Sequence, residues 1–490
     1  MLYESTRGQA QAVPAARALL FGAAPDGGLY MPQRFPDLSY LLKEEYAGLD
    51  YAALAGRVFA ALLPGFDELK LNAVARSAYG PGFDDPAVAP LVRVGGDYIL
   101  ELSHGPTAAF KDLALQALPR LMALAREKTG AGERCLVLTA TSGDTGSAAM
   151  RGFMDVPGFR VLVFYPEGGV SAVQLAQMTR MPGGNVKAVG IRGNFDEAQS
   201  GVKEAFLAAD SLLPRGMRLS SANSINIGRL VPQLVYYIAA IRALQKSGAL
   251  KPGQTVDFVV PSGNFGDILA GWLAGKMGLP VGRLVCASNA NRVLTDFLQT
   301  GVYDRRRSLQ KTISPSMDIL VSSNLERLLF EASGRDGARV RLWMNELKEK
   351  GFYRVEEDVM AAIRRQFTGF SASDGEALGA IRDVWERHRY LLDPHTAAAW
   401  LGRRVLSGGD TPCVVLSTAS PFKFASAVLK ALGEDVPDDI SLPGALSEKT
   451  GIAVPRSLRG LERLPLRHGE IINKEDMLQT VRREAASWKA

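Results

Sequence analysis

The sequence predicts an α/β protein in which parallel strands are covered by helices. Short apolar runs typical of buried strands alternate with amphipathic helical patterns from about residue 134 to residue 300, and the pattern returns at 412–416. Such alternation is typical of parallel sheets with helices on both faces. A second observation supports it: the turn Ser-Gly-x-x-Gly lies between a strand and a helix twice, at 142–146 and at 262–266.

The bulk composition is that of an ordinary globular protein. The chain has 490 residues, of which 47% are hydrophobic and 22% charged, and a net charge of +6. Cys135, Cys286 and Cys413 lie far apart in apolar runs, which indicates reduced thiols. The four histidines lack metal-ligand spacing, and neither a signal peptide nor an uninterrupted membrane-spanning run is evident. We expect a cytoplasmic monomer or homodimer that binds a small molecule, without metal, nucleic-acid or membrane partners.

Turns and composition divide the chain into three parts. Residues 1–95 form a helical, loop-rich leading region, and 96–430 form the main α/β core, which begins near a hairpin about Gly95 and Gly96. Within the core, 331–388 is charged and helical and is interpreted as an inserted lobe. Residues 431–490 are a turn-rich extension that ends in a helix. A long helix over 225–246 contains Pro232, so a break is expected there.

One lysine follows a pair of helix breakers. Gly105 and Pro106 precede Lys111, and an amphipathic helical pattern begins directly after it. A lysine in apolar surroundings near a positive helix end has a lowered pKa. Its neutral amine is a nucleophile that forms a Schiff base with a carbonyl group or with pyridoxal 5'-phosphate (PLP). The alternative is a solvated lysine that merely begins a helix.

The two Ser-Gly-x-x-Gly turns are candidate anion sites. A glycine-rich turn before a helix exposes backbone N–H groups, and ligands of parallel sheets bind at the carboxyl ends of the strands. Two such turns and a nucleophilic lysine suit PLP bonded to an amino acid, which carries a phosphate, a carboxylate and an imine. The rival, a dinucleotide-binding fold, lacks its glycine pattern.

Several longer motifs carry a family resemblance. The leading region contains Ser-Thr-Arg-Gly at 5–8 and Pro-Asp-Gly-Gly-Leu-Tyr at 25–30. Further motifs occupy 104–112, 139–146, 221–226 and 260–267. Together they resemble the threonine synthase family, in the branch found in enteric bacteria and fungi. The resemblance implies a two-lobed PLP-enzyme core similar to the β subunit of tryptophan synthase.

The resemblance also implies roles for individual residues. Lys111 would bind PLP covalently and act as general base and acid. The cofactor would further contact Gly263, Asn264 and Phe265 through backbone N–H groups, Asp267 at the following helix start, and Thr418 near the pyridine nitrogen. Weaker assignments to substrate binding are Thr107, Ser142, Gly143, Asp144, Thr145, Asn223, Ser224, Asn226 and Arg229. Asp144 would lie near the substrate carboxylate, so a neutralising partner is needed but not identified.

The implied reaction is the last step of threonine biosynthesis. O-phospho-L-homoserine and water would yield L-threonine and phosphate, by γ-elimination followed by β-addition of water. Two alternatives stay open: a related threonine or serine dehydratase, and a non-catalytic relative that binds phosphorylated ligands. Structural interpretations also stay open for single residues. Asn223 and Asn226 suit helix caps, Thr418 suits a strand-end cap, and Arg229 suits a surface ion pair.

Overall fold

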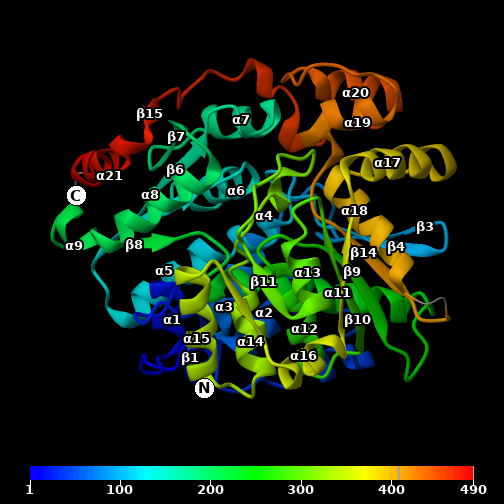
Figure 1. The fold of residues 1–490 in the computed structure, drawn as a ribbon, viewed down its shortest axis with the longest axis horizontal. Coiled ribbons are helices and arrows are strands. Elements are labelled where there is room, and N and C mark those ends of the chain that lie inside the picture. The colour runs from blue at the N-terminus through cyan, green and yellow to red at the C-terminus, as the bar shows by residue number, and fades with distance from the viewer. Residues whose placement is uncertain (407–408, 489–490) are drawn as a thin grey trace.

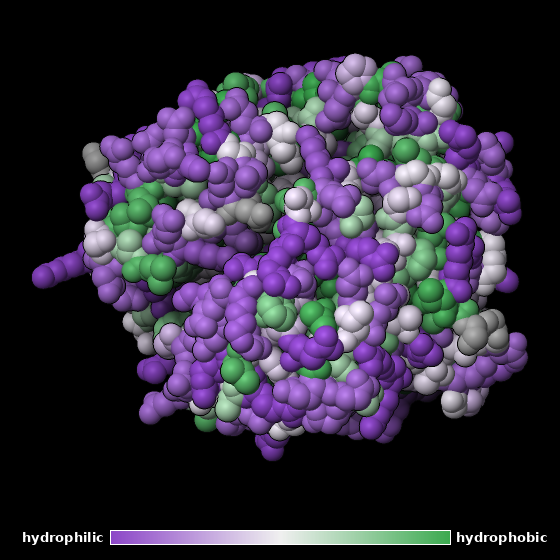
Figure 2. All heavy atoms as spheres, viewed as in Figure 1, coloured by the Kyte–Doolittle hydropathy of each residue, from purple (hydrophilic) through white to green (hydrophobic). Residues whose placement is uncertain are grey.

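The computed structural model describes residues 1–406 and 409–488, so the last two residues of the predicted extension lie outside the described residues. Two sheets with covering helices form its core, one on each side of Figure 1. Figure 2 shows that the face in view is mostly hydrophilic, with hydrophobic residues in small groups. The predicted α/β class is therefore confirmed.

The larger sheet has six strands, all parallel except one edge strand, which pairs antiparallel to its neighbour. In spatial order they are β13 (Phe367–Ser371), β10 (Val281–Ser288), β9 (Val256–Pro261), β14 (Cys413–Ser417), β4 (Asp97–Glu101) and β3 (Leu91–Val94). Phe258 and Val260 of β9 join the same hydrophobic cluster as Ile268 of α12 (Gly266–Lys276), while Val259 joins that of Ala398 in α18 (Pro394–Gly402). Alternate residues of a strand face opposite sides, so α12 and α18 cover the two faces.

The smaller sheet has five parallel strands. In spatial order they are β15 (Ile471–Asn473), β7 (Val186–Arg192), β6 (Phe159–Pro166), β5 (Arg134–Ala140) and β8 (Met217–Ser221). Leu136 and Leu138 of β5 pack in one cluster with α8 (Phe195–Leu207) and α21 (Met477–Ala486). Val137 packs in another cluster with α6 (Asp144–Phe153) and α7 (Ala172–Thr179). Helices therefore cover both faces, as the alternation of strand and helix predicted.

Helices around the two sheets begin and end where capping residues predict. Capping boxes of Ser171 with Gln174, Asn194 with Glu197, and Ser373 with Glu376 begin α7, α8 and α17. The predicted break at Pro232 is present: α10 ends at Leu230 and α11 begins at Gln233. The remaining helices of the core are α4 (Lys111–Leu115), α5 (Leu118–Thr129), α9 (Ala209–Leu212), α10 (Ile227–Leu230), α11 (Gln233–Lys246), α13 (Val293–Thr300), α17 (Asp374–His388) and α19 (Ala425–Ala431).

The leading region, residues 1–95, packs against helices α5 and α11 of the core. Its hairpin pairs β1 with β2, while α2 packs on α11 and α1 packs on α5. Asp50 caps α2 by accepting from the backbone N–H of Ala53. The elements of this region are β1 (Tyr3–Ser5), α1 (Ala15–Phe21), β2 (Tyr30–Pro32), α2 (Tyr51–Leu62) and α3 (Glu68–Ala78).

The segment 331–388 is more than the helical lobe that its composition predicted. It contributes β12 (Phe352–Arg354), which pairs with β11 (Val302–Asp304), and β13, which forms the edge of the larger sheet. Strands as short as β12 and β13 show no clear two-residue alternation of apolar and polar side chains. The prediction for this segment therefore followed its charged helical pattern alone. The helices nearby are α14 (Leu325–Ala332), α15 (Gly337–Glu349) and α16 (Glu357–Arg364).

The C-terminal segment adds a strand and a helix to the five-stranded sheet and its cover. After α20 (Leu442–Thr450), β15 pairs parallel with β7, and α21 packs against α8. One stretch of the described chain, Ile227–Lys246, is long and apolar enough to cross a membrane, but 83% of it is buried in the protein. This stretch therefore serves as a core helix pair beside α12.

Candidate active site

Lys111 is the first residue of α4, as the breakers before it predicted. The preceding loop is fastened to the helix by Asp112, which accepts from the Thr107 backbone N–H at 2.8 Å and from its hydroxyl at 2.7 Å. At Gly105 a Cβ atom would lie 2.5 Å from the Asp112 carboxyl group, so only glycine fits there. Burial lowers the pKa of Lys111, which favours the neutral amine that a nucleophile requires.

Lys111 opens into a cavity at the carboxyl ends of strands from both sheets. Loops after β5, β8, β9 and β14 all contribute to its lining, in agreement with the general position of ligand sites in parallel sheets. The predicted site residues that line it are Lys111, Ser142, Thr145, Asn223, Ser224, Arg229, Gly263, Asn264, Phe265, Asp267 and Thr418.

The turn between β9 and α12 has the features of a phosphate cradle. Among the residues that the structure describes, the backbone N–H groups of Gly263, Asn264 and Phe265 donate no hydrogen bond. The carbonyl oxygens of two of these residues accept side-chain hydrogen bonds: Ser322 donates to Gly263 at 2.7 Å, and Asn324 donates to Asn264. Free donors at a helix N-terminus bind anions, so this turn fits the phosphate group of PLP.

Asp267 lies in the first turn of α12 with one carboxylate oxygen in use. Its Oδ1 accepts from the hydroxyl groups of Tyr236 at 2.6 Å and Tyr237 at 2.9 Å. Its buried Oδ2 has no hydrogen-bond partner among the described residues. Burial raises the pKa of Asp267 to about 6.

Thr418 directly follows β14 at the edge of the cavity. Its carbonyl oxygen accepts from the backbone N–H of Phe110 at 2.8 Å, which connects the end of this strand to the residue before Lys111. Thr418 therefore lines the cavity, where a contact with the cofactor stays a prediction, and its backbone holds the loop before Lys111.

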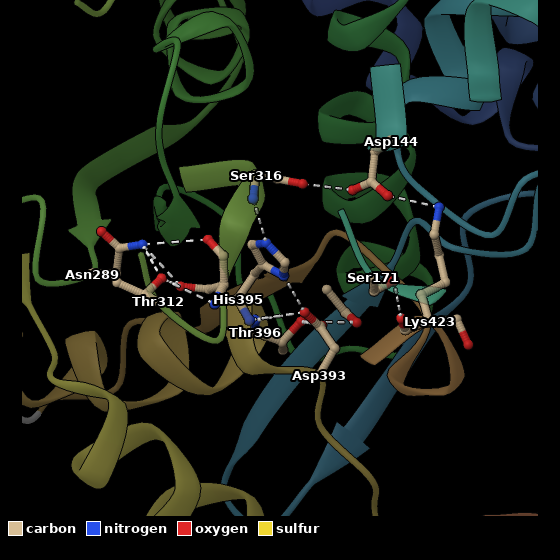
Figure 3. Close-up of polar contacts among 12 residues, drawn as sticks. Asp144, Ser171, Asn289, Thr312, Ser316, Asp393, His395, Thr396 and Lys423 are labelled. Atoms are coloured by element: carbon tan, nitrogen blue, oxygen red, sulfur yellow. Dashed lines mark hydrogen bonds and ion pairs between the residues drawn. The ribbon is translucent and has the colours of Figure 1, made fainter. Parts of the chain in front are cut away.

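Asp144 has the neutralising partner that the sequence did not identify. Its Oδ1 lies 2.7 Å from Nζ of the fully buried Lys423 (Figure 3). Its Oδ2 lies 3.5 Å from Nζ of Lys111. Gln174 donates to Oδ1 and Ser316 donates to Oδ2, each at 2.8 Å. Although burial opposes ionisation, the charge of Lys423 and then that of Lys111 hold the pKa of Asp144 well below its usual range.

Arg229 is a buried cation at the cavity wall. Its Nη1 donates to the carbonyl oxygen of Ala222, and its Nε has no partner among the described residues. Burial lowers the pKa of Arg229 to about 10. The interpretation as a surface ion pair is therefore wrong, since the side chain is buried and no acidic group pairs with it in the described chain. A second unpaired atom, Oδ1 of Asn223, belongs to the same wall.

Four predicted substrate residues are absent from the lining of the cavity: Thr107, Gly143, Asp144 and Asn226. The Thr107 hydroxyl is used by Asp112, and Asn226 caps α10 and donates to the Leu19 carbonyl oxygen at 3.0 Å. Gly143 has a φ of 130°, and a Cβ atom there would lie 2.3 Å from the Gln174 side chain. Thr107, Gly143 and Asn226 therefore shape the loops around the site, and their assignment to substrate binding stays a prediction.

The structure also brings in residues that the sequence analysis missed. Lys423, Gln174 and Ser316 surround Asp144, and His395 accepts from the Ser316 backbone N–H at 3.3 Å (Figure 3). Asp393 in turn bonds the other ring nitrogen of His395 at 2.8 Å. Only Lys423 had a recognisable pattern, because it lies between Phe422 and Phe424 in an apolar run. The others reach the site from distant segments.

Comparisons with known proteins agree with this geometry. The family model "Threonine synthase N terminus" matches residues 2–79, "Pyridoxal-phosphate dependent enzyme" matches 93–343, and "Threonine synthase, C-terminal" matches 396–483. A threonine synthase of Pseudomonas aeruginosa is 41% identical over 480 residues, which are 96% of this chain and 99% of that protein.

A solved structure and a human relative extend the comparison. The crystal structure of PLP-bound threonine synthase from Brucella melitensis is 38% identical, with a TM-score of 0.86 over 99% of this chain and 100% of that one. Human "Threonine synthase-like 1" is 39% identical over 85% of this chain, which spans 58% of that longer protein.

Proposed function

Because the chain belongs to the threonine synthase family and is a PLP-dependent lyase of that kind, we propose that the cavity around Lys111 is where it forms L-threonine. The substrates are O-phospho-L-homoserine and water, and the second product is phosphate. The observation that carries the placement is that one cavity holds a mostly buried amine and a turn whose backbone N–H groups have no acceptor among the described residues.

Two groups of residues are proposed to bind the cofactor. Lys111 binds it covalently, and the N–H groups of Gly263, Asn264 and Phe265 bind its phosphate. Asp267 lies beside this turn, and Thr418 offers a hydroxyl group to the pyridine nitrogen. When bound, PLP supplies an electron sink that stabilises negative charge on the substrate carbon atoms.

Lys111 is proposed to move the protons of the reaction. Once its amine is released by substrate, it removes the proton from Cα and returns protons at later steps. Its lowered pKa suits this role, since a base must be neutral before it accepts a proton. Asp144, 3.5 Å away, is the acceptor for the resulting ammonium group.

The two anionic ends of the substrate are assigned to different groups of lining residues. Ser142 and Thr145, at the start of α6, offer donors to the carboxylate. Arg229 is assigned to the leaving phosphate, because it is a buried cation without an acidic partner in the described chain. Asn223 and Ser224 line the same part of the cavity and complete this assignment.

The test is a product balance. The full-length chain with PLP is incubated with O-phospho-L-homoserine, and threonine and phosphate are counted in parallel. Equal amounts of both are expected. Phosphate with 2-oxobutyrate would show elimination without controlled addition of water, and the absence of both products would favour the dehydratase or the non-catalytic alternative.

We further propose that the chain acts in the cytoplasm as a monomer or homodimer, without nucleic-acid or membrane partners. Cys135, Cys286 and Cys413 are free thiols, which is compatible with a reducing compartment. Light scattering of the purified chain and fractionation of its native cells would test the two parts of this proposal separately.

A further inference from the structure

Lys423 is a second lysine at the active site, and its surroundings are unusual. It lies in a short 3-10 helix, Pro421–Phe424, and its side chain is 0% exposed. Its ammonium group contacts Oδ1 of Asp144 at 2.7 Å and donates to the carbonyl oxygen of Thr107 at 2.9 Å. A fully buried lysine is costly without a defined partner, so this one has a specific use.

Asp144 is shared between two lysines. Lys423 contacts Oδ1 and Ser316 donates to Oδ2 (Figure 3). Lys111 also approaches Oδ2, at 3.5 Å. The other charged or titratable groups that act on this pair are Arg229, which faces Lys111, His395, which faces Asp144, and Asp112, which faces Lys423. A carboxylate already neutralised by one ammonium group attracts a second one less strongly.

We propose that Lys423 is a positioning residue for Lys111: by pairing with Asp144 it weakens the hold of that carboxylate on the Lys111 ammonium group. Lys111 therefore loses its proton at a lower pH than it would beside an unshared carboxylate. Lys423 also keeps Asp144 ionised and in place while Lys111 is bound to cofactor. This inference rests on the proposed role of Lys111 as the PLP-binding amine.

The proposal predicts a shift in one direction. In the Lys423→Met variant, Asp144 is left with Lys111 as its only lysine partner and stabilises the ammonium form. The pH at which the amine becomes reactive therefore rises, by about one unit or more. In the double variant Asp144→Asn, Lys423→Met both charges are gone, so this midpoint returns to the wild-type value or below it.

The measurement is the rate at which the full-length chain, stripped of cofactor, takes up added PLP, from about pH 6 to about pH 10. Imine formation requires the neutral amine, and it is followed by the violet absorption of Lys111-bound PLP. Gln174→Met removes a hydrogen bond to the same Oδ1 without a charge, and Lys430→Met removes a lysine whose side chain is 50% exposed. Gln174→Met is expected to raise the midpoint much less than Lys423→Met does, and Lys430→Met is expected to leave it unchanged.

The double variant separates electrostatics from structural damage. A purely structural role for Lys423 would make the second substitution additive or harmful, so failure of the double variant to lower the midpoint would overturn the proposal. Should Lys423→Met not fold, Lys423→Arg keeps the charge and is expected to retain the wild-type midpoint, and a raised midpoint there would also contradict it. PLP uptake needs no substrate, so failure here leaves the threonine assay unaffected.

Discussion

Asn324 donates to the carbonyl oxygen of Asn264 twice, from its side-chain amide at 2.9 Å and from its backbone N–H at 3.1 Å. Asn324 is bonded by the buried Arg327, which also donates to the carbonyl oxygens of Tyr30 and Ile225. The guanidinium group of Arg327 therefore connects the leading region to the turn between β9 and α12.

The neighbouring contact extends this connection. Thr6 donates to Glu326 at 2.6 Å, and Arg7 binds both carboxylate oxygens of Glu326 at 3.0 Å. The two motifs of the leading region thus meet α14 on successive residues, Glu326 and Arg327. The two motifs therefore hold α14 in place, and the residue just before α14, Asn324, supports the turn between β9 and α12.

Arg327→Met is expected to weaken both PLP binding and folding. Two buried oxygen atoms and one partly buried oxygen atom would lose their donor, at roughly 2–4 kcal/mol in the free energy of unfolding. PLP titration and urea unfolding measure the two effects. Arg339→Met removes an arginine whose side chain is 28% exposed and which pairs with Glu356 and Asp358, so it should cost less than about 1 kcal/mol. Unchanged PLP affinity in Arg327→Met would contradict the support role.

Lys111→Ala is expected to abolish the violet absorption of bound PLP and to lower turnover by about three orders of magnitude or more. The free energy of unfolding should hardly fall, because the variant no longer buries an amine. Absorption spectra and the threonine assay check this, with the exposed Lys246→Ala as the control. Full activity in Lys111→Ala would contradict the whole scheme.

Arg229→Met is expected to lower kcat/KM for O-phospho-L-homoserine by about 100-fold, because a buried cation facing a phosphate would be lost. Arg229→Lys keeps the charge but loses the planar donor set, so an intermediate loss is expected. Steady-state kinetics and inhibition by free phosphate provide the measurement. If phosphate inhibits the Arg229→Met variant as well as the wild type, the leaving group lies elsewhere.

Asp267→Asn is expected to change how stability depends on pH. The pKa of Asp267 is raised from 3.8 to about 6 in the folded chain, so the folded state keeps a proton that the unfolded state loses in that window. Stability contributed by this group is present below the lower pKa and is lost as pH rises toward the higher one. The asparagine variant should avoid that loss, with a relative gain of about 3 kcal/mol by pH 7.

Urea unfolding of the cofactor-free chain at about pH 4 and about pH 7 measures the Asp267 effect. The difference between variant and wild type must grow with pH. A constant difference would mean that Asp267 is ionised throughout, held by a donor to its Oδ2.

Local patterns predicted much of this structure, because they depend on neighbours in the sequence. The breakers at Gly105 and Pro106 placed Lys111 at a helix start, and Pro232 correctly divided the long helix. The Ser-Gly-x-x-Gly turn at 262–266 lies where a buried strand ends, and the backbone N–H groups of its residues 263–265 donate no hydrogen bond within the described chain. These features follow from backbone geometry alone.

Contacts between distant segments were outside the reach of such patterns. Nothing near Asp144 in the sequence indicates Lys423, Ser316 or His395, which tertiary folding brings together. The motif of Asn223 and Asn226 did not reveal which of the two faces the cavity. One serves the wall and the other a helix cap, since a loop turns neighbouring side chains in different directions.

The last strand of the smaller sheet has a consequence for synthesis of the chain. β7 is complete once Arg192 has been made, but β15, which covers its open edge, begins at Ile471. For most of translation this edge offers unpaired backbone groups to other strands, which is a risk of mispairing. The sheet closes only after Ile471–Asn473 has been made, so a chain truncated before Ile471 should aggregate rather than remain a smaller enzyme.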